Sequence, residues 1–198
     1  MKVITREYLE KINACLPALE WFSRKYPEGK ELKLLKKDAL YNSSWSSWLI
    51  THILNREDCI RYAIFAAKQV IHIFEKKYPE DLRPRKAIEA AENYLNNPDA
   101  AYAAAAAAAD AADAAYAAAY AAYYAAYYAD AAYYAAYAAY YAAYAAYAAD
   151  AADAAYYAAY AVYAAAYAAY SAYEKNKMKL IILEYGLKLI YEGDYVIW

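Results

Sequence analysis

The pattern of hydrophobic and polar positions divides the chain into short amphipathic segments followed by a long tract of little variety. In the first hundred residues, apolar side chains recur every three or four positions, which is typical of helices with one buried face. The segments that follow this pattern are 4–14, 18–26, 30–40, 45–52, 56–78 and 85–96. No segment alternates with period two over a useful length, although the tail 191–198 is compatible with a short extended piece.

The tract 100–173 is 74 residues long and contains 46 Ala, 21 Tyr and 5 Asp, with Val162 and Ser171 as its other members. Ala is the strongest helix former, and neither Gly nor Pro interrupts the tract. We therefore predict helix throughout. A single helix of this length would extend about 110 Å, so we expect two or three helices that pack together.

The spacing of Tyr within the tract indicates where it divides. From 116 to 144, Tyr residues, with Asp130 in one place, recur at alternating intervals of four and three residues, which is a heptad pattern. From 144 to 153 the steps become three, and this shift predicts a break at 145–155. A second break near 128–131, where Asp130 could cap a new helix, is left open.

These patterns predict an all-α fold. We expect a compact helical bundle in which the amphipathic N-terminal helices pack against two or three Ala/Tyr-rich helices. One domain would comprise an amphipathic region at 1–97, the Ala/Tyr-rich helices at 98–174, and a C-terminal helix and tail at 175–198.

Charge is distributed unevenly along the chain. Residues 1–86 carry 17 Lys and Arg against 11 Asp and Glu, whereas residues 87–173 carry 8 acidic residues and no basic one. The two parts could attract one another, or each could face a different partner. A solvated helical head beside a weakly acidic arm is the simpler interpretation.

The tract also repeats itself. The motif Asp-Ala-Ala-Asp-Ala-Ala-Tyr occurs at 110–116 and again at 150–156, and the tyrosines that follow it correspond as well. Duplication of a helix would produce this pattern, as would slippage in a low-complexity coding sequence.

The tract has more tyrosines than one packed seam requires, so we expect some phenols to face solvent. Tyr gives a large contact area at a low cost in conformational entropy and is frequent at binding hot spots. The candidates for a partner-binding surface are Tyr124, Tyr128, Tyr133, Tyr140 and Tyr144. A phenol-rich core with incidental exposure is the alternative.

The chain offers little catalytic chemistry. His52 and His72 are each isolated on apolar segments, and no Gly-rich phosphate loop or nucleophile–base arrangement is present. The Asp pairs at 110/113 and 150/153 would bind a divalent cation only if they met, and they are better interpreted as solubilising acids. We expect no enzyme, no cofactor and no metal.

Composition also bears on partners and location. Nucleic-acid binding by the tract is disfavoured because stacking aromatics act there together with Lys or Arg, which the tract lacks. The tract is too weakly apolar to predict membrane insertion. The two cysteines, Cys15 and Cys59, lie outside any CxxC pattern and no secretory signal is evident, so we expect a cytoplasmic protein with two buried, reduced thiols.

Several segments resemble a known family. These are 15–29, 45–49 and 78–92, of which Arg83-Pro-Arg-Lys-Ala-Ile-Glu-Ala-Ala is the most specific, followed by the Ala/Tyr-rich tract. Together they resemble immunity proteins found beside bacterial toxin genes and in phages, over about residues 10–173. The resemblance implies an all-helical fold that neutralises a toxin or another antagonistic protein by binding it, without catalytic residues.

Three functional hypotheses follow. The leading one is a protein-binding inhibitor of the immunity or anti-defence type, whose Tyr-rich helices contact a toxin or defence protein. The second is a protein that sequesters a small aromatic or nucleotide-like ligand, with Arg83, Arg85 and Lys86 pairing with its phosphate. The third is a self-associating module that forms a homo-oligomer through the heptad seam.

Overall fold

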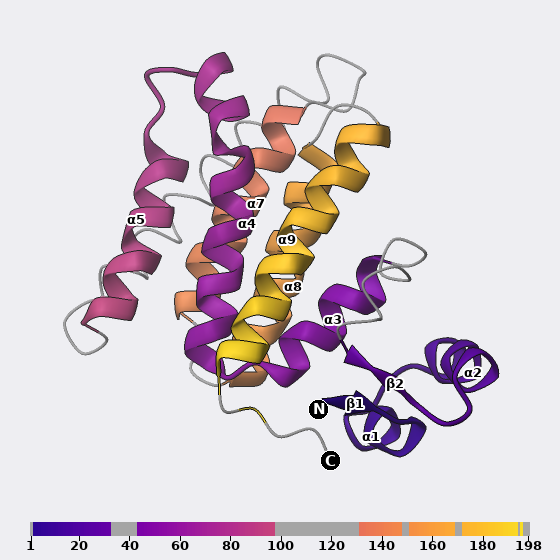
Figure 1. Ribbon diagram of the computed structural model, residues 1–198. Coiled ribbons are helices and arrows are strands. Elements are labelled where there is room, and N and C mark those ends of the chain that lie inside the picture. Colours follow the sequence, from indigo (N-terminus) through magenta and orange to yellow (C-terminus); the bar gives the residue numbers. More distant parts are fainter. Residues whose placement is uncertain are drawn as a thin grey trace.

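The computed structural model describes residues 2–32, 43–97, 131–147, 151–168, 172–193 and 195, and over these residues the chain is all-α apart from one pair of two-residue strands (Figure 1). The described helices are α1 (Arg6–Lys11), α2 (Leu16–Lys25), α3 (Ser43–Ile53), α4 (Arg56–Lys77), α5 (Arg83–Asn96), α7 (Ala131–Tyr147), α8 (Ala151–Ala168) and α9 (Ala172–Glu192). The predicted fold class is confirmed.

The bundle has two layers around α4. Figure 1 shows α5, α4 and α9 in one layer, with α7 and α8 behind it. α7 packs against α4 and α5, whereas α8 packs against α3, α4 and α9. α4 is central because its apolar residues are buried around most of its circumference, among them Ile60, Val70 and Phe74.

Alanine forms the interior of the α7–α8 pair. The fully buried alanines are Ala138, Ala139, Ala142, Ala143, Ala145 and Ala146 in α7, and Ala154, Ala158, Ala161, Ala164, Ala165 and Ala168 in α8. Since the distance between two helix axes depends on the side chains at their contact, methyl groups permit a close approach. The predicted packing of Ala/Tyr-rich helices against the amphipathic head is therefore achieved through methyl groups.

The tract divides where its spacing predicts. α7 ends at Tyr147 and α8 begins at Ala151, inside the predicted interval of 145–155. The two helices pack extensively against each other. The second predicted break, at 128–131, falls at the edge of the described residues and stays a prediction.

The N-terminal region departs from the helical prediction. β1 (Val3–Ile4) pairs antiparallel with β2 (Lys30–Glu31), so the predicted helix over 30–40 is wrong at its start, and 33–40 lie outside the described residues. Gly29 makes the turn possible: its φ is 80°, and a Cβ there would lie 2.7 Å from the Ile4 carbonyl oxygen. Pairing between distant segments overrides the local helical pattern.

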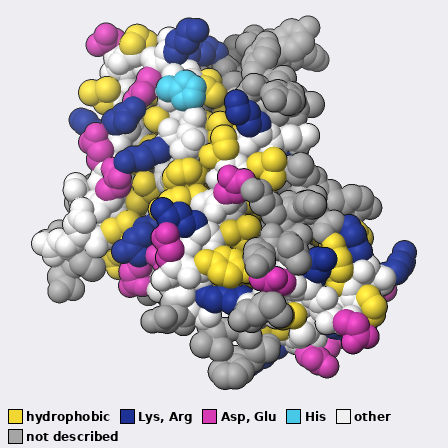
Figure 2. Space-filling view, viewed as in Figure 1, with side chains coloured by type: hydrophobic (Ala, Val, Ile, Leu, Met, Phe, Trp, Pro, Cys, Tyr) yellow, Lys and Arg dark blue, Asp and Glu magenta, His cyan; other side chains and the backbone are white. Residues whose placement is uncertain are grey.

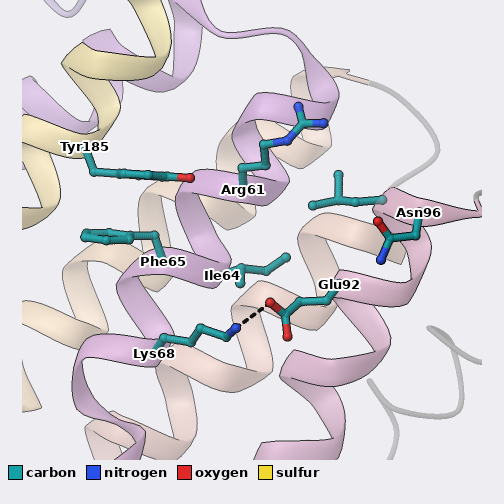
Figure 3. Close-up of a pocket in the computed structure, with 8 residues that line it drawn as sticks. Arg61, Ile64, Phe65, Lys68, Glu92, Asn96 and Tyr185 are labelled. Atoms are coloured by element: carbon teal, nitrogen blue, oxygen red, sulfur yellow. Dashed lines mark hydrogen bonds and ion pairs between the residues drawn. The ribbon is translucent and has the colours of Figure 1, made fainter.

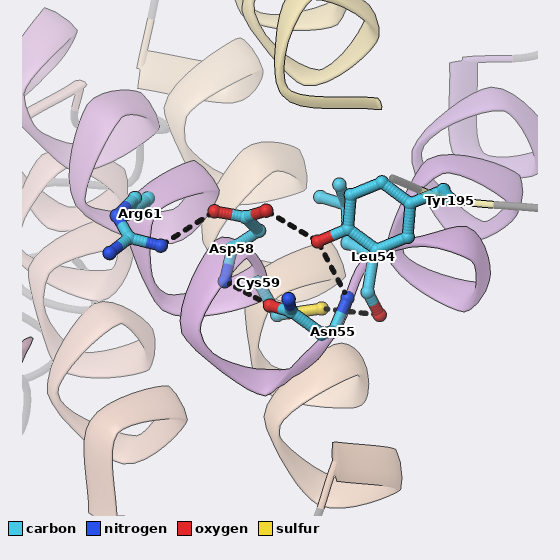
Figure 4. A network of polar contacts seen from close by, with 6 residues as sticks. All are labelled: Leu54, Asn55, Asp58, Cys59, Arg61 and Tyr195. Atoms are coloured by element: carbon cyan, nitrogen blue, oxygen red, sulfur yellow. Dashed lines mark hydrogen bonds and ion pairs between the residues drawn. The ribbon is translucent and has the colours of Figure 1, made fainter. Parts of the chain in front are cut away.

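The chain ends are tied to the bundle. The ammonium of Lys2 donates hydrogen bonds to the carbonyls of Ile190 and, at 3.2 Å, Gly193. The hydroxyl of Tyr195 donates to the carboxylate of Asp58 and accepts from the backbone N–H of Asn55 at 3.1 Å (Figure 4). These two bonds hold Tyr195 at the start of α4. The expected extended tail is wrong for residues 191–192, because α9 continues to Glu192. None of the helices described here is both long and apolar enough to cross a membrane.

Candidate functional site

A cluster of touching phenol rings connects α7 and α8. Centroid separations run from 4.4 Å between Tyr137 and Tyr141 to 6.2 Å between Tyr144 and Tyr147, which is the usual range for aromatic pairs. The tyrosine cluster consists of Tyr137, Tyr140, Tyr141, Tyr144, Tyr147, Tyr156, Tyr157 and Tyr160.

The inner part of the tyrosine cluster is structural. Tyr141 is buried, and its hydroxyl lies 2.5 Å from that of Tyr137 in a shared hydrogen bond. Burial, followed by this hydrogen bond, raises the pKa of Tyr141 above its usual value. The phenol therefore stays neutral near pH 7, and the hydrogen bond satisfies a polar group that would otherwise be costly to bury.

Two of the tyrosines predicted to contact a partner are partly covered in the bundle. Tyr140 and Tyr144 are half-buried, because they cover the junction where Ala143 of α7 meets Ala87 and Ala90 of α5. The sequence could not reveal this cover, since it depends on α5 approaching α7. Of the other predicted contact residues, Tyr124 and Tyr128 lie outside the described part of the chain, as does the side chain of Tyr133.

Besides Tyr147 of α7 and Tyr191 of α9, three exposed phenols of the described residues lie together on the outer face of α8. Tyr156, Tyr160 and Tyr163 are 53%, 39% and 46% exposed, and their spacing of four and three places them on one side of the helix. We call these three residues the α8 stripe. Asp153, three positions before Tyr156, is exposed on the same side. Because a charged carboxylate favours water, Asp153 is the residue in the sequence that indicates which side of α8 faces solvent.

The α8 stripe is nearly free of charge, unlike the opposite layer. The sequences of α7 and α8 contain Asp153 and no other ionisable acid or base apart from tyrosine. Figure 2 shows Lys, Arg, Asp and Glu interspersed over the face formed by α4, α5 and α9. Contact with the α8 stripe would therefore involve aromatic area and hydroxyl groups.

Two of the three cations predicted to bind a ligand phosphate form ion pairs with carboxylates of the chain. Arg83 binds Asp81 through two hydrogen bonds of 2.8 and 2.6 Å, and these bonds lower the pKa of the Asp81 carboxyl. Arg85 binds Glu75 in the same bidentate way, at 2.6 and 2.7 Å. Lys86 is exposed on α5. Both guanidinium groups already bind carboxylates, so a phosphate would have to compete with Asp81 and Glu75, and the predicted phosphate site stays a prediction.

The two cysteines differ, since Cys59 is buried whereas Cys15, which was expected to be buried as well, is exposed. Cys59 is fully buried, and its thiol lies 3.3 Å from the carbonyl of Thr51 and 3.8 Å from that of Leu54, the second of which Figure 4 shows. Burial and the neighbouring acids raise the pKa of this thiol to about 12, so the thiolate that reacts is scarce. Among the residues described, no three His, Cys, Asp or Glu side chains are grouped to hold a metal ion.

A cavity of about 370 Å³ lies on the charged layer, between α4, α5 and α9 (Figure 3). α4 contributes Arg61, Ile64, Phe65 and Lys68, which lie on one face of the helix at positions i, i+3, i+4 and i+7. The remaining lining residues are Glu92, Leu95 and Asn96 of α5 and Tyr185 of α9. No pattern in the sequence pointed to this cavity, because its walls come from three separate helices.

Comparison of the chain with protein-family models, with curated proteins and with solved structures gives no significant match.

Proposed function

We propose that this protein is a non-enzymatic inhibitor of the immunity or anti-defence type, which binds a toxin or defence protein through the α8 stripe. The observation that carries the proposal is the exposure of Tyr156, Tyr160 and Tyr163 in a row on a helix whose other side is buried in the bundle. A rigid helix that presents rotamer-poor aromatic side chains loses little entropy on binding. The resemblance of residues 83–91 to immunity proteins supports the same class.

The chemistry of the α8 stripe specifies the partner's surface. Asp153 adds a negative charge beside the three rings, and neither α7 nor α8 contains Lys or Arg. Phenol rings attract cations to their faces. A basic partner surface with apolar area between its Arg and Lys residues would therefore fit the stripe better than an acidic one, which Asp153 would repel.

The experiment is coexpression with the product of each neighbouring gene. We expect one of these products to be toxic alone, to be neutralised by this protein, and to copurify with it in a stoichiometric complex. Replacing all three stripe residues by Ala removes the rings and keeps a good helix former. Because buried tyrosines at interfaces are often hot spots, the triple variant should weaken binding by about 30-fold or more.

Tyr191→Ala is the matched control, because Tyr191 is 41% exposed but lies on α9. It should bind as the wild type does, and circular dichroism should show unchanged helicity for every variant. Full neutralisation by the triple variant would contradict the proposal. Light scattering would also contradict it if the mass of the wild type rose with concentration and that of the triple variant did not. A second copy of the chain would then occupy the α8 stripe.

A further inference from the structure

The cavity between α4, α5 and α9 contains polar groups that the fold does not use. Within the described part of the chain, neither the hydroxyl of Tyr185 nor the side-chain amide of Asn96 makes a hydrogen bond. Figure 3 shows the Tyr185 hydroxyl pointing from α9 towards Arg61. Phe65 stacks beneath Tyr185 with 4.0 Å between centroids and 9° between planes, so the hydroxyl is held in place by a rigid ring pair.

The lining side chains include two cations, Arg61 and Lys68, and one acid, Glu92, while Asp58 binds Arg61 from outside the lining. Lys68 forms an ion pair with Glu92 across the cavity (Figure 3), so these two charges cancel. Arg61 uses one nitrogen, Nη1, to bind Asp58 at 2.7 Å, and Asp58 also accepts from Tyr195 outside the cavity. Arg61 therefore has further N–H donors for a ligand, beside the hydroxyl of Tyr185.

The remaining walls are apolar. Figure 3 shows Ile64 between Arg61 and the Lys68–Glu92 pair, with the rings of Phe65 and Tyr185 on the α9 side. Leu95 is a further apolar lining residue, from α5. The volume, about 370 Å³, is within the range of small-molecule sites. An anionic group at one end and an apolar body along the walls are the features that complement this arrangement.

We propose that this cavity binds a small organic anion with an apolar body, of the size of an aromatic carboxylate. The anionic group receives hydrogen bonds from Arg61 and Tyr185, and the apolar body lies against Ile64 and Leu95. Asn96 supplies a polar contact at the α5 end. This site is separate from the α8 stripe, so the two proposals stand or fall independently.

The test uses four probes that share a benzene ring: benzoate, phenyl phosphate, benzyl alcohol and benzylamine. Backbone amide shifts are followed by nuclear magnetic resonance on the full chain, since molecules this small bind weakly. Benzoate and phenyl phosphate should both shift the amides around 61–68, 92–96 and 185, with benzyl alcohol weaker and benzylamine without effect. Inorganic phosphate alone should bind more weakly than phenyl phosphate, because it lacks the apolar body.

Two conservative variants should move affinity in opposite directions. Arg61→Gln removes the anion's donor and should weaken benzoate binding about tenfold or more. Glu92→Gln removes a negative charge from the cavity and frees Lys68, so it should strengthen binding about two- to fivefold. Arg83→Gln is the control, because it removes the same charge at the opposite end of α5, where Arg83 binds Asp81.

Several outcomes would overturn the proposal. Among the probes, these are equal binding of benzylamine and benzoate, amide shifts confined to residues outside the cavity, and no shift with any probe. Among the variants, they are an equal loss of benzoate affinity in Arg61→Gln and Arg83→Gln, and weaker benzoate binding in Glu92→Gln. Equal affinity for inorganic phosphate and phenyl phosphate would also overturn it, because the apolar walls would then contribute nothing.

Discussion

The two layers of the bundle are packed with different kinds of side chain. In the layer of α4, α5 and α9, large side chains such as Ile60, Phe74 and Ile190 are buried, and ion pairs cover the outer face. In α7 and α8, the interior is mostly methyl groups with the buried ring of Tyr141, and the other described tyrosines are half-buried or exposed. Large residues bury more apolar area for each position, whereas alanines permit closer helices and leave aromatic surface for other contacts.

The two layers also depend on each other electrostatically. No base lies in the last turn of α7, whose carbonyls need donors. Arg56, at the start of α4, donates to the Ala146 carbonyl at 3.1 Å and also binds the hydroxyl of Tyr94, whose ring lies beneath its guanidinium. The amphipathic head thus supplies a cationic donor to an end of α7 that has no basic residue of its own.

Truncation of a large side chain should have the largest effect. Phe74→Ala removes a ring that is 2% exposed in the core, and the resulting cavity should lower the free energy of unfolding by about 3–5 kcal/mol. The corresponding truncation in the Ala layer, Ala142→Gly, should cost only about 1 kcal/mol, mainly through helix propensity. Urea unfolding measures both. Equal costs would show that the two layers do not differ in how they are stabilised.

Enlargement should affect the Ala layer. Ala142 is fully buried in α7, and Ala142→Leu should destabilise the fold by about 1–3 kcal/mol because the close helices cannot accommodate the larger side chain. Tyr163→Leu is the control on the exposed side of α8 and should change stability by no more than about 0.5 kcal/mol. A stabilised Ala142→Leu would mean that the methyl interior contains unfilled space.

Loss of the link between the layers should have a somewhat smaller effect. Arg56→Met keeps much of the side chain's length but removes the donors to Ala146 and Tyr94, so unfolding should become easier by about 1–2 kcal/mol. Arg61→Met, which breaks an exposed pair with Asp58, should cost less than about 0.5 kcal/mol. Thermal unfolding of the two variants compares them directly, and equal losses would argue against the helix-end role of Arg56.

The smallest effect should be at alkaline pH. The pKa of Tyr141 is raised in the folded protein, so above about pH 10 the unfolded chain loses this proton while the folded chain keeps it. The contribution of the Tyr141 phenol to the free energy of unfolding is fully present below about pH 10. It falls as pH rises, by about 1.4 kcal/mol at pH 11. Tyr141→Phe should therefore lose less stability than the wild type between pH 8 and 11, measured by urea unfolding at each pH. Identical losses would indicate an accessible Tyr141 phenol.

The regular helices were predictable from the sequence, and the surfaces were not. The segment 56–78 matched α4 closely because its apolar stripe is long and consistent, and the change in Tyr spacing located the division between α7 and α8. The same spacing did not distinguish half-buried Tyr144 from exposed Tyr160, since both lie in similar Ala/Tyr surroundings. Exposure is decided by which helices pack on each side, and spacing along one helix does not contain that information.

The sequence by itself predicted that the described part of the chain is mainly helical and that the Ala/Tyr tract divides within 145–155, because propensity and periodicity are local properties. Only the tertiary structure decided that Tyr156, Tyr160 and Tyr163 form an exposed row, that the arginines at 83 and 85 hold carboxylates, and that residues of three helices line an open pocket beside Arg61. Each of these features joins residues distant in the chain, so its existence depends on how the layers approach one another.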